Sequence, residues 1–446
     1  MERGRGRAAQ TEAGRGHRQP ADHLRPDRRP VGLLTLSTDP RATTPPLNPG
    51  GVDWRRNLAA LWFAEFTAIF GFSFAFPFLS IFISQDLGVH SNRDLYLWTA
   101  AAASASGLSM GIASPIWGVM GDRYGRKPML LRSMIGGALT VGLIYFAQTP
   151  TELLVLRFLQ GATSGTVAAA TALVAVETPR NRVGWALGVV SSAVALGGAI
   201  GPVVGGLAAS VFGLRLVFLG GGVLLLLSLI PVIAIVRESP MVRRSGPQLG
   251  TLTLIGQVPD LKKALSVLVG AQGLISVANS ATQQLVVLRL LTMTSSGVTT
   301  ITGIGFGLAG VASSAAAVFY TTVTRRFGYV KTTALAAVLV AVAVTLIGVS
   351  PWITVVIIAI GLNGLFSGVL IPATASMIGL ETPHEAQSTV FGINASSVAF
   401  GFFLGPLIGG SVAAATSNVP AALIVIAVLA LGLAVLLYTG AREPTR

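Results

Sequence analysis

The sequence predicts an all-α membrane protein in which 12 transmembrane helices form two parallel six-helix repeats around a central cavity. Three observations carry this prediction. The 446 residues are 52% hydrophobic and only 11% charged, whereas soluble domains carry about 25% charged residues. Twelve apolar stretches follow one another, each near the roughly 20 residues that a helix needs to cross a bilayer. A thirty-residue segment occurs twice, once in each half of the chain.

The repeated segment runs from Glu177 to Gly206 and again from Glu381 to Gly410. Twelve of its thirty positions are identical in an alignment without gaps. Both copies begin with Glu-Thr-Pro and end with Gly-x-x-x-Gly-Pro-x-x-Gly-Gly. A repeat of this length indicates that the chain is built twice from one plan, and parallel repeats are a known arrangement of membrane helices.

The order of apolar and polar segments predicts the domain organisation. We expect a disordered cytoplasmic tail over 1–52, because this stretch is rich in Arg, Gly and Pro and lacks an apolar run; a start codon assigned too early is the alternative. We then expect an N-terminal six-helix bundle over 53–238, a cytoplasmic linker over 239–261, a C-terminal bundle over 262–440 and a cytoplasmic tail over 441–446. The expected spans are 57–83, 95–119, 128–147, 151–175, 183–207, 211–236, 264–292, 298–323, 331–350, 352–378, 387–412 and 417–438.

The distribution of Lys and Arg predicts the orientation. From residue 53 on, eighteen fall on segments assigned to the inside and three on the outside, Arg93, Arg215 and Arg289. This bias predicts a multi-pass protein of the cell (plasma, or inner) membrane with both termini cytoplasmic. The same distribution explains the net charge of +14 without a nucleic-acid partner. The chain has no Cys and four scattered His, so we expect no disulfide, metal site or cofactor.

The Gly-Pro pattern lies in the fifth and eleventh expected spans. Glycines four residues apart share one helix face and let a neighbouring backbone approach closely, while proline removes a hydrogen bond and is expected to kink the helix. Two copies at matching positions favour a functional constraint over ordinary small-residue packing. The residues concerned are Gly197, Gly201, Pro202, Gly205 and Gly206, with Gly401, Gly405, Pro406, Gly409 and Gly410 in the second copy.

A short, basic loop is expected between the second and third spans. Its acid, Asp122, can pair with the neighbouring cations or face the positive N-terminus of a helix, and either contact would hold the cytoplasmic face shut. The alternative is a topology determinant with one incidental acid. The second half carries a decayed copy, Arg325-Arg326-Phe327-Gly328. The residues of this expected gate are Gly118, Asp122, Arg123, Gly125, Arg126 and Lys127.

These motifs resemble those of the major facilitator superfamily, over residues 53 to 440. The loop from Gly118 to Lys127 is similar to the superfamily's loop motif, and Gly197–Gly206 is similar to the motif of its twelve-helix drug/proton antiporter group. Leu-x-x-x-Arg-x-x-Gln-Gly, from Leu153 to Gly161, resembles that group's fourth-helix motif and places Arg157 at its arginine, although Thr163 replaces a later glycine. The resemblance implies alternating access and export driven by inward proton flow.

Two ionisable residues are expected inside the bilayer. Glu65 is the one acid well within an expected span, and intramembrane acids are functional candidates by default. At mid-membrane a carboxyl group can take a proton from one side and release it to the other, or attract a cationic substrate; a packing role is the alternative. Arg157 is expected to face the cavity, with snorkelling to the outer interface as the alternative. We interpret both as proton-coupling residues.

The resemblance also implies a central cavity lined by the first, fourth, seventh and tenth helices. An aromatic wall with few hydrogen-bonding groups suits bulky lipophilic molecules, although such aromatic residues also commonly face lipid. The residues expected to line this cavity are Glu65, Phe66, Phe70, Gln272, Asn279, Gln283 and Asn363.

The function that follows is secondary active export of hydrophobic or cationic small molecules in exchange for protons, that is, multidrug efflux. The expected partners are a lipophilic small molecule, protons and membrane lipid, and we expect a monomer. A facilitator or importer of one metabolite is the first alternative, and a transport-inactive membrane sensor or scaffold is the second. We expect no enzyme, because no cluster of nucleophile, base and orienting residue is visible.

Overall fold

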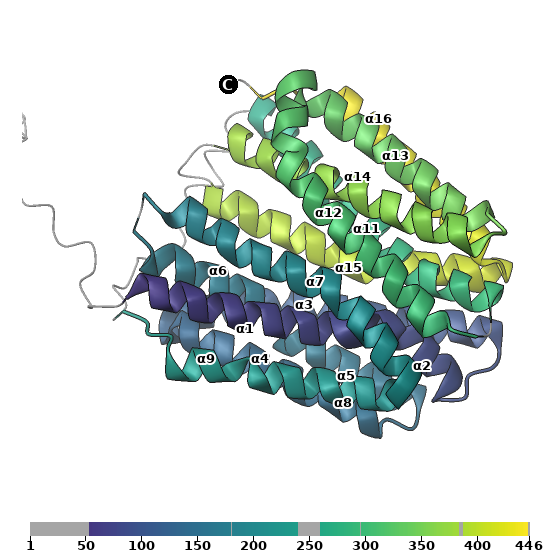
Figure 1. Cartoon of the computed structure of the whole chain (residues 1–446). Coiled ribbons are helices and arrows are strands. Elements are labelled where there is room, and N and C mark those ends of the chain that lie inside the picture. The colour runs from purple at the N-terminus through teal and green to yellow at the C-terminus, as the bar shows by residue number, and fades with distance from the viewer. Residues whose placement is uncertain (1–52, 180, 240–258, 295, 383–386, 445–446) are drawn as a thin grey trace, which may run out of the picture. The chain divides into compact units, whose positions relative to one another are not determined.

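In the computed structural model, the described residues are 53–179, 181–239, 259–294, 296–382 and 387–444. The expected N-terminal tail and most of the expected linker lie outside them. The described residues from 53 on belong to one compact unit, and Figure 1 shows its helices. They are α1 (Trp54–Ala75), η1 (Phe76–Phe78), α2 (Leu79–Gln85), α3 (Asn92–Tyr124), α4 (Arg126–Leu143), η2 (Ile144–Phe146), α5 (Pro150–Thr163), α6 (Thr166–Glu177), α7 (Val183–Phe212), α8 (Leu214–Leu227), α9 (Leu229–Ala234), α11 (Pro259–Met293), α12 (Val298–Phe327), α13 (Tyr329–Val349), α14 (Ile353–Glu381), α15 (Gln387–Thr416) and α16 (Val419–Gly440).

The all-α membrane architecture predicted from composition is confirmed. Among the described residues, eleven helical stretches are long and apolar enough to cross a membrane. The second expected span corresponds to α3, which has 33 residues and is rich in Ser, Gly and Ala. These small side chains lower its hydropathy without shortening it, so α3 supplies the twelfth span by length and position.

Three expected spans are interrupted, and each interruption has a local cause. The first span continues from α1 through η1 into α2, with Pro77 in the 3₁₀ turn. The fourth span is divided into α5 and α6 at Ser164 and Gly165, and Gly165 has a φ of 122° that only glycine adopts easily. The sixth span is divided at Ser228 into α8 and α9. A pattern of apolar residues does not register such breaks, because apolarity continues across them.

The helices have two ends, which we name by the basic loop. The motif end contains the turn between α3 and α4, and the opposite end contains the turns from α2 to α3 and from α11 to α12. Arg215 bonds to the carbonyl groups of Tyr145 and Ala147 at the opposite end and lies 3.5 Å from the carboxylate of Asp86. The three arginines assigned to the outside thus lie towards the end away from the basic loop.

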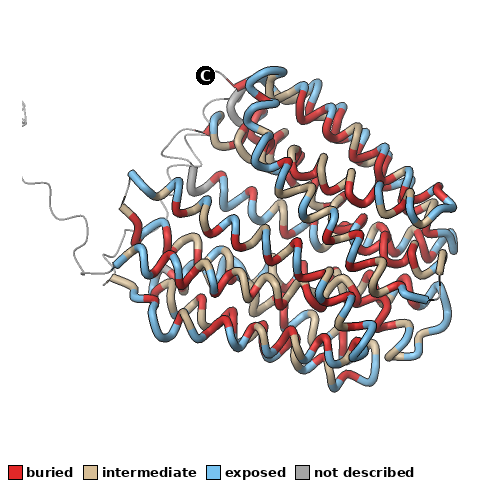
Figure 2. Tube along the Cα trace, viewed as in Figure 1, coloured by how far each residue is buried: buried red, intermediate tan, exposed pale blue. Residues whose placement is uncertain are grey.

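Two helix pairs make most of the contact between the first half of the chain and the second. The helix α3 packs against α15, and α7 packs against α12. Within the halves, α1 packs on α7 and α8, and α11 packs on α15 and α16. Figure 2 shows that buried residues follow these helix contacts while exposed residues follow the outward faces. The apolar outward faces suit a lipid environment.

The contacts between the halves gather towards the opposite end. Gly107 of α3 lies against the backbone of Phe402, Gly206 of α7 against Thr299, and Gly410 of α15 against Tyr96. Towards the motif end, side chains of α3 and α12 are open instead: Val119 is 71% exposed and Val318 is 70% exposed. In this conformation the halves therefore close at one end of the helices and separate at the other.

Candidate functional site

Glu65 lies in the interior of the first half. Its side chain on α1 is fully buried, beside Thr166 at the start of α6. Thr166 is near enough to interact with the carboxyl group but forms no hydrogen bond of normal geometry, and neither carboxyl oxygen has a partner among the described residues. A buried polar group without a partner costs stability, so its retention calls for a functional explanation.

The second half places an amide where the first half has this carboxyl group. Gly401 lies against the carbonyl oxygen of Gly273 and the backbone nitrogen of Val277, as Gly197 lies against those of Phe66 and Phe70. The residue just before Phe66 is Glu65, and the residue just before Gly273 is Gln272, which is 5% exposed. Gln272 is therefore the structural counterpart of Glu65, uncharged at every pH.

Arg157 is held by neutral acceptors on the first half. Its guanidinium group donates to the carbonyl oxygen of Ala102 at 3.2 Å, the hydroxyl of Ser106 at 2.8 Å and the amide oxygen of Gln160 at 2.6 Å. It also lies 4.4 Å from the ring centroid of Phe76, a cation–π contact. The side chain thus joins α5 to α3 and to η1, and no ion pair with Glu65 is seen in the described structure.

The break in the fourth span has dedicated partners on neighbouring helices. The indole N–H of Trp117 donates to the carbonyl oxygen of Ala162 at 2.6 Å, and the guanidinium group of Arg132 donates to that of Ser164 at 3.0 Å. Arg132 also stacks over Trp117 at 3.7 Å. A cation and a donor therefore satisfy the negative C-terminal end of α5. This pair was not predicted from the sequence. The signal that could have indicated it is a Trp and an Arg within two neighbouring expected spans.

The glycines of α7 mark where other backbones come closest. A Cβ atom at Gly197 would lie 2.8 Å from the carbonyl oxygen of Phe66, and one at Gly205 would lie 2.8 Å from the carbonyl carbon of Phe74, both on α1. Real side chains do not reach such distances, so only glycine fits there. Gly201 likewise faces α1, Gly206 faces Thr299 of α12, and Pro202 lies inside the helix.

The second copy makes the corresponding contacts. A Cβ atom at Gly401 would lie 2.8 Å from the carbonyl oxygen of Gly273 on α11, and one at Gly410 would lie 2.9 Å from that of Tyr96 on α3. Each motif therefore packs its helix on the first helix of its own half and touches the other half with its last glycine. The remaining members, Gly405, Gly409 and Pro406, face α11 or lie inside α15.

The basic loop forms a tight turn that a distant carboxylate holds. Gly125 has a φ of 109°, which suits glycine. The carboxylate of Glu238, after α9, accepts from the backbone N–H groups of Arg126 at 2.7 Å and Lys127 at 2.9 Å. An acid at a helix N-terminus is stabilising. The expected latch acid, Asp122, has a side chain outside the described structure, whereas Glu238 was not singled out from the sequence.

The remaining loop-motif residues have simpler surroundings. The ammonium group of Lys127 donates to the carbonyl oxygen of Val236 at 2.7 Å, and Arg123 lies over the ring of Tyr124 at 5.3 Å. Gly118 is exposed, and an added Cβ atom would meet nothing within 4 Å. The close approach that a glycine permits is therefore unused at Gly118 in this conformation.

The decayed loop of the second half keeps the turn and the cap. Gly328 has a φ of 84°, and the carboxylate of Glu443 accepts from the backbone N–H groups of Tyr329 and Val330. Glu443 follows α16 as Glu238 follows α9. The sequence signal that could have found both is an Arg-Glu pair directly after the last helix of each half.

In the first half, further hydrogen bonds surround Glu238, the carboxylate that caps α4. Asn57 exchanges two hydrogen bonds with the backbone of Arg237, at 2.6 and 2.9 Å. The buried carboxylate of Glu177 accepts from the backbone N–H and the hydroxyl of Ser239, both at 2.8 Å. Residues 237–239 thus join the motif ends of α1, α4 and α6.

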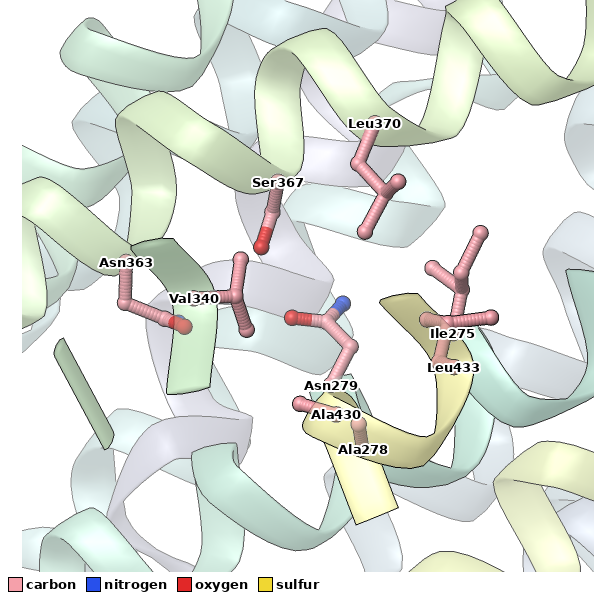
Figure 3. Close-up of a pocket in the computed structure, with 9 residues that line it drawn as sticks. All are labelled: Ile275, Ala278, Asn279, Val340, Asn363, Ser367, Leu370, Ala430 and Leu433. Atoms are coloured by element: carbon pink, nitrogen blue, oxygen red, sulfur yellow. The ribbon is translucent and has the colours of Figure 1, made fainter. Parts of the chain in front are cut away.

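The polar residues expected to line one central cavity divide into three groups. Glu65 and Gln272 are buried within their own halves, and Gln283 is exposed. Asn279 and Asn363 line a small cavity of about 10 Å³ inside the second half, together with Ser367. Figure 3 shows the amide of Asn279 and the hydroxyl of Ser367 pointing towards each other from α11 and α14. This volume holds about one water molecule.

Phe66 and Phe70 belong to a column of stacked rings on α1. The ring of Trp62 lies 5.5 Å from that of Phe66, Phe66 lies 6.0 Å from Phe70, and Phe70 lies 5.8 Å from Phe74. Residues four apart meet on one helix face, and stacked aromatic pairs stabilise each other. The column is therefore a rigid aromatic wall along α1.

The helix order, the doubled Gly-Pro motif and the buried ionisable residues define a polytopic helical membrane protein of the transporter class. A family model described as the Major Facilitator Superfamily matches residues 61–302 and 273–446, and the chain belongs to this superfamily.

Relatives and solved structures agree with this assignment. The chain is 34% identical over 371 residues to the "Multidrug resistance protein MdtG" of Dickeya zeae, covering 81% of this chain and 89% of that protein. The protein of the same name in Escherichia coli is 32% identical over 371 residues, with 82% and 90% covered.

Among solved structures, the POT family transporter PepTSo has a TM-score of 0.69 at 12% identity, covering 86% of this chain and 97% of that chain. The human organic anion transporter MFSD10 has a TM-score of 0.61 at 19% identity, with 86% and 99% covered. At these identities the likeness shows the fold alone.

Proposed function

We propose that this protein is a multidrug efflux transporter, which exports hydrophobic or cationic small molecules across the plasma membrane in exchange for protons. The relatives that share a third of its residues over most of their length are named multidrug resistance proteins, and this supports the substrate class. The observation that carries the coupling is Glu65: it is fully buried, and its carboxyl oxygens have no partner within the described structure.

The proposed mechanism is alternating access between two bundles, residues 53–238 and 262–440. The corresponding contacts of Gly197 and Gly401 support two equivalent units. In this conformation the units meet at the end opposite to the basic loop. If that loop is cytoplasmic, as the Lys and Arg distribution predicts, the protein is open to the cytoplasm. Closure of the motif end would bring the open faces of α3 and α12 towards the other unit.

Proton exchange is assigned to Glu65, with Arg157 as its positioning partner within the same bundle. In the outward-open state the carboxylate would take up one proton, and in the inward-open state the O–H bond would break and release that proton to the cytoplasm. Burial favours the neutral carboxylic acid, so the closed surroundings of Glu65 fit the inward-open state before this proton is released. Arg157 bonds α5 to α3 close to the break that precedes Thr166, and so holds the segment that faces Glu65.

The test is flux in proteoliposomes of purified protein under an imposed pH gradient, with ethidium as the probe. The wild-type protein should move ethidium when the gradient is present, and a protonophore should abolish the movement. The variant E65Q keeps the shape of the side chain and removes its titration, so the gradient-driven flux should be lost.

The matched control is E152Q, which removes an exposed carboxylate from the same half and should transport normally. Full gradient-driven flux in E65Q would remove Glu65 from the mechanism. Downhill movement of a single metabolite, without ethidium transport, would favour a facilitator instead.

A further inference from the structure

An aromatic groove lies at the motif end of α1 and α7, where no role has yet been assigned. Its volume is about 460 Å³, within the range of about 300–1,000 Å³ that ligand sites occupy. Both helices pack together along their length and run side by side in Figure 1. The lining residues are Trp54, Arg55, Leu58, Ala59, Trp62, Phe63, Trp185 and Val189.

The walls of the groove offer flat, open ring faces. Three of the chain's six tryptophans line it, and the rings of Phe63 and Trp185 are 61% and 59% exposed. Tryptophan at a membrane interface commonly serves only as an anchor for the helix. Here, however, the side chains form a concave surface between two helices, which an interface anchor does not require.

One wall of the groove is held in place by the protein. The indole N–H of Trp62 donates to the hydroxyl of Ser192 on α7 at 3.0 Å. Its ring is parallel to that of Phe66 to within 2° and begins the stacked column that continues along α1. A ligand that stacks here therefore meets a surface whose rotamer is already fixed, which lowers the entropic cost of binding.

The groove carries one formal charge on its lining, and that charge is positive. Arg55 lines it, with its guanidinium carbon 5.4 Å from the ring centroid of Trp54. The nearby acid Asp53 is occupied: it caps α1 by accepting from backbone N–H groups and forms an ion pair with Arg56 at 3.3 Å. The lining therefore has a cation that attracts anions and no carboxylate that attracts cations.

We propose that this groove is a binding site for lipophilic aromatic anions, that is, flat apolar molecules that carry a carboxylate or sulfonate group. The ring system stacks between Trp62 and Trp185, and the acidic group lies beside Arg55. The proposal concerns binding and holds whether or not export is coupled to protons. It extends the proposed substrate class from neutral and cationic molecules to anionic ones.

The test uses three probes with one ring system and different charges: 1-pyrenesulfonate, 1-pyrenemethanol and protonated 1-pyrenemethylamine. Full-length protein is placed in nanodiscs of zwitterionic lipid, and binding is followed by energy transfer from tryptophan to pyrene. The sulfonate should bind about tenfold more tightly than the ammonium probe, because an exposed charge pair contributes about threefold in each direction.

Two pairs of variants locate the effect. R55Q should remove the preference for the sulfonate, and R55E should reverse it, whereas R326Q changes an exposed arginine at the motif end of the second half, outside the groove, and should keep it. W185A should weaken all three probes by about tenfold, since it removes an aromatic face on which the ring system stacks. W352A, at a more exposed tryptophan of the opposite end, should bind as the wild type does.

Several results would overturn the assignment. Equal binding of sulfonate and ammonium probes to the wild type would remove the charge selectivity. Equal losses in R55Q and R326Q would indicate general surface charge, and equal losses in W185A and W352A would indicate partition into lipid. Complete displacement of the sulfonate in nanodiscs that contain phosphatidylglycerol would identify an anionic lipid as the occupant instead.

Discussion

The two halves of the molecule pack their helices in the same way but differ in their buried polar side chains. In each half, the Gly-Pro helix packs on the first helix through equivalent backbone positions, and a carboxylate after the last helix caps the helix that follows the tight turn. Glu65 in the first half corresponds to Gln272 in the second. Gly161 of α5 lies against Ser106 of α3, and Gly364 of α14 lies against Ala309 of α12 in the same way. Four residues before these glycines stand Arg157 and Ile360, so Arg157 corresponds to a buried isoleucine.

The helix packing is therefore duplicated in this fold, whereas the buried ionisable side chains are not. Close helix contacts are needed twice because both halves must pack in the same way, whereas ionisable groups inside the bilayer are costly and Glu65 and Arg157 have neutral counterparts in the second half. The bonds that Asn57 makes also lack a copy, since Ala264 takes its place in the corresponding stretch. The first half thus carries the buried Glu65 and Arg157 and the additional bonds of Asn57, and the second half has neutral residues at the corresponding positions.

The largest expected effect on stability comes from disturbing the helix packing that the two halves share. G205A should lower the free energy of unfolding by about 3 kcal/mol, because the added methyl group would meet the backbone of Phe74, which cannot rotate away. G405A should cost a similar amount if the halves pack alike. Thermal unfolding in detergent checks both variants against G198A, where an added Cβ atom meets nothing within 4 Å. A loss confined to one half would break the structural equivalence.

The second-largest effect is expected when Arg157 is replaced by isoleucine, the residue at the corresponding position of the second half. R157I should cost about 2 kcal/mol, because a carbonyl, a hydroxyl and an amide lose their donor. R157K should recover part of this stability, since one ammonium group cannot reach all three acceptors. Unfolding in denaturant measures the stability, and ethidium flux measures function. If R157I were as stable and as active as the wild type, the difference between the halves at this position would be incidental.

A smaller effect is expected at the two helix caps. E238Q and E443Q should each cost about 1 kcal/mol, because a charged acceptor at a helix N-terminus is replaced by a neutral one. The bonds of Asn57 and Ser239 also anchor the first half, so E238Q should become more costly when combined with N57A. Thermal unfolding of the single and double variants gives the coupling. Strict additivity would show that the extra bonds of the first half do not act together with its cap.

The smallest effect on stability is expected at Gly118. G118A should change the free energy of unfolding by less than about 0.5 kcal/mol, because the position is open. Transport should nevertheless fall, since closure of the motif end would bring α3 against the other half. Thermal unfolding and ethidium flux on one preparation separate the two quantities. Normal flux in G118A would mean that the motif end closes without close packing at this glycine.

Much of the architecture was predictable from the sequence because it depends on composition and spacing. The twelve spans follow from apolar length, and the two Gly-Pro copies locate the closest helix contacts. The interruption at Gly165 was not predictable, because a single glycine in an apolar run is compatible with an unbroken helix. Glu238 and Glu443 were missed for a related reason: each lies far along the chain from the backbone groups that it binds, and the Arg-Glu pair that marks both positions does not say which groups they bind.

Residue type and order alone predict the helical membrane fold, its duplication and the scarcity of buried acids. The three-dimensional structure was needed to show that Glu65 has no hydrogen-bond partner among the described residues, that Arg157 binds neutral acceptors and that the halves meet at one end. Burial and hydrogen bonding depend on neighbours from other helices. Those neighbours are brought together by packing, which no local stretch of the chain contains.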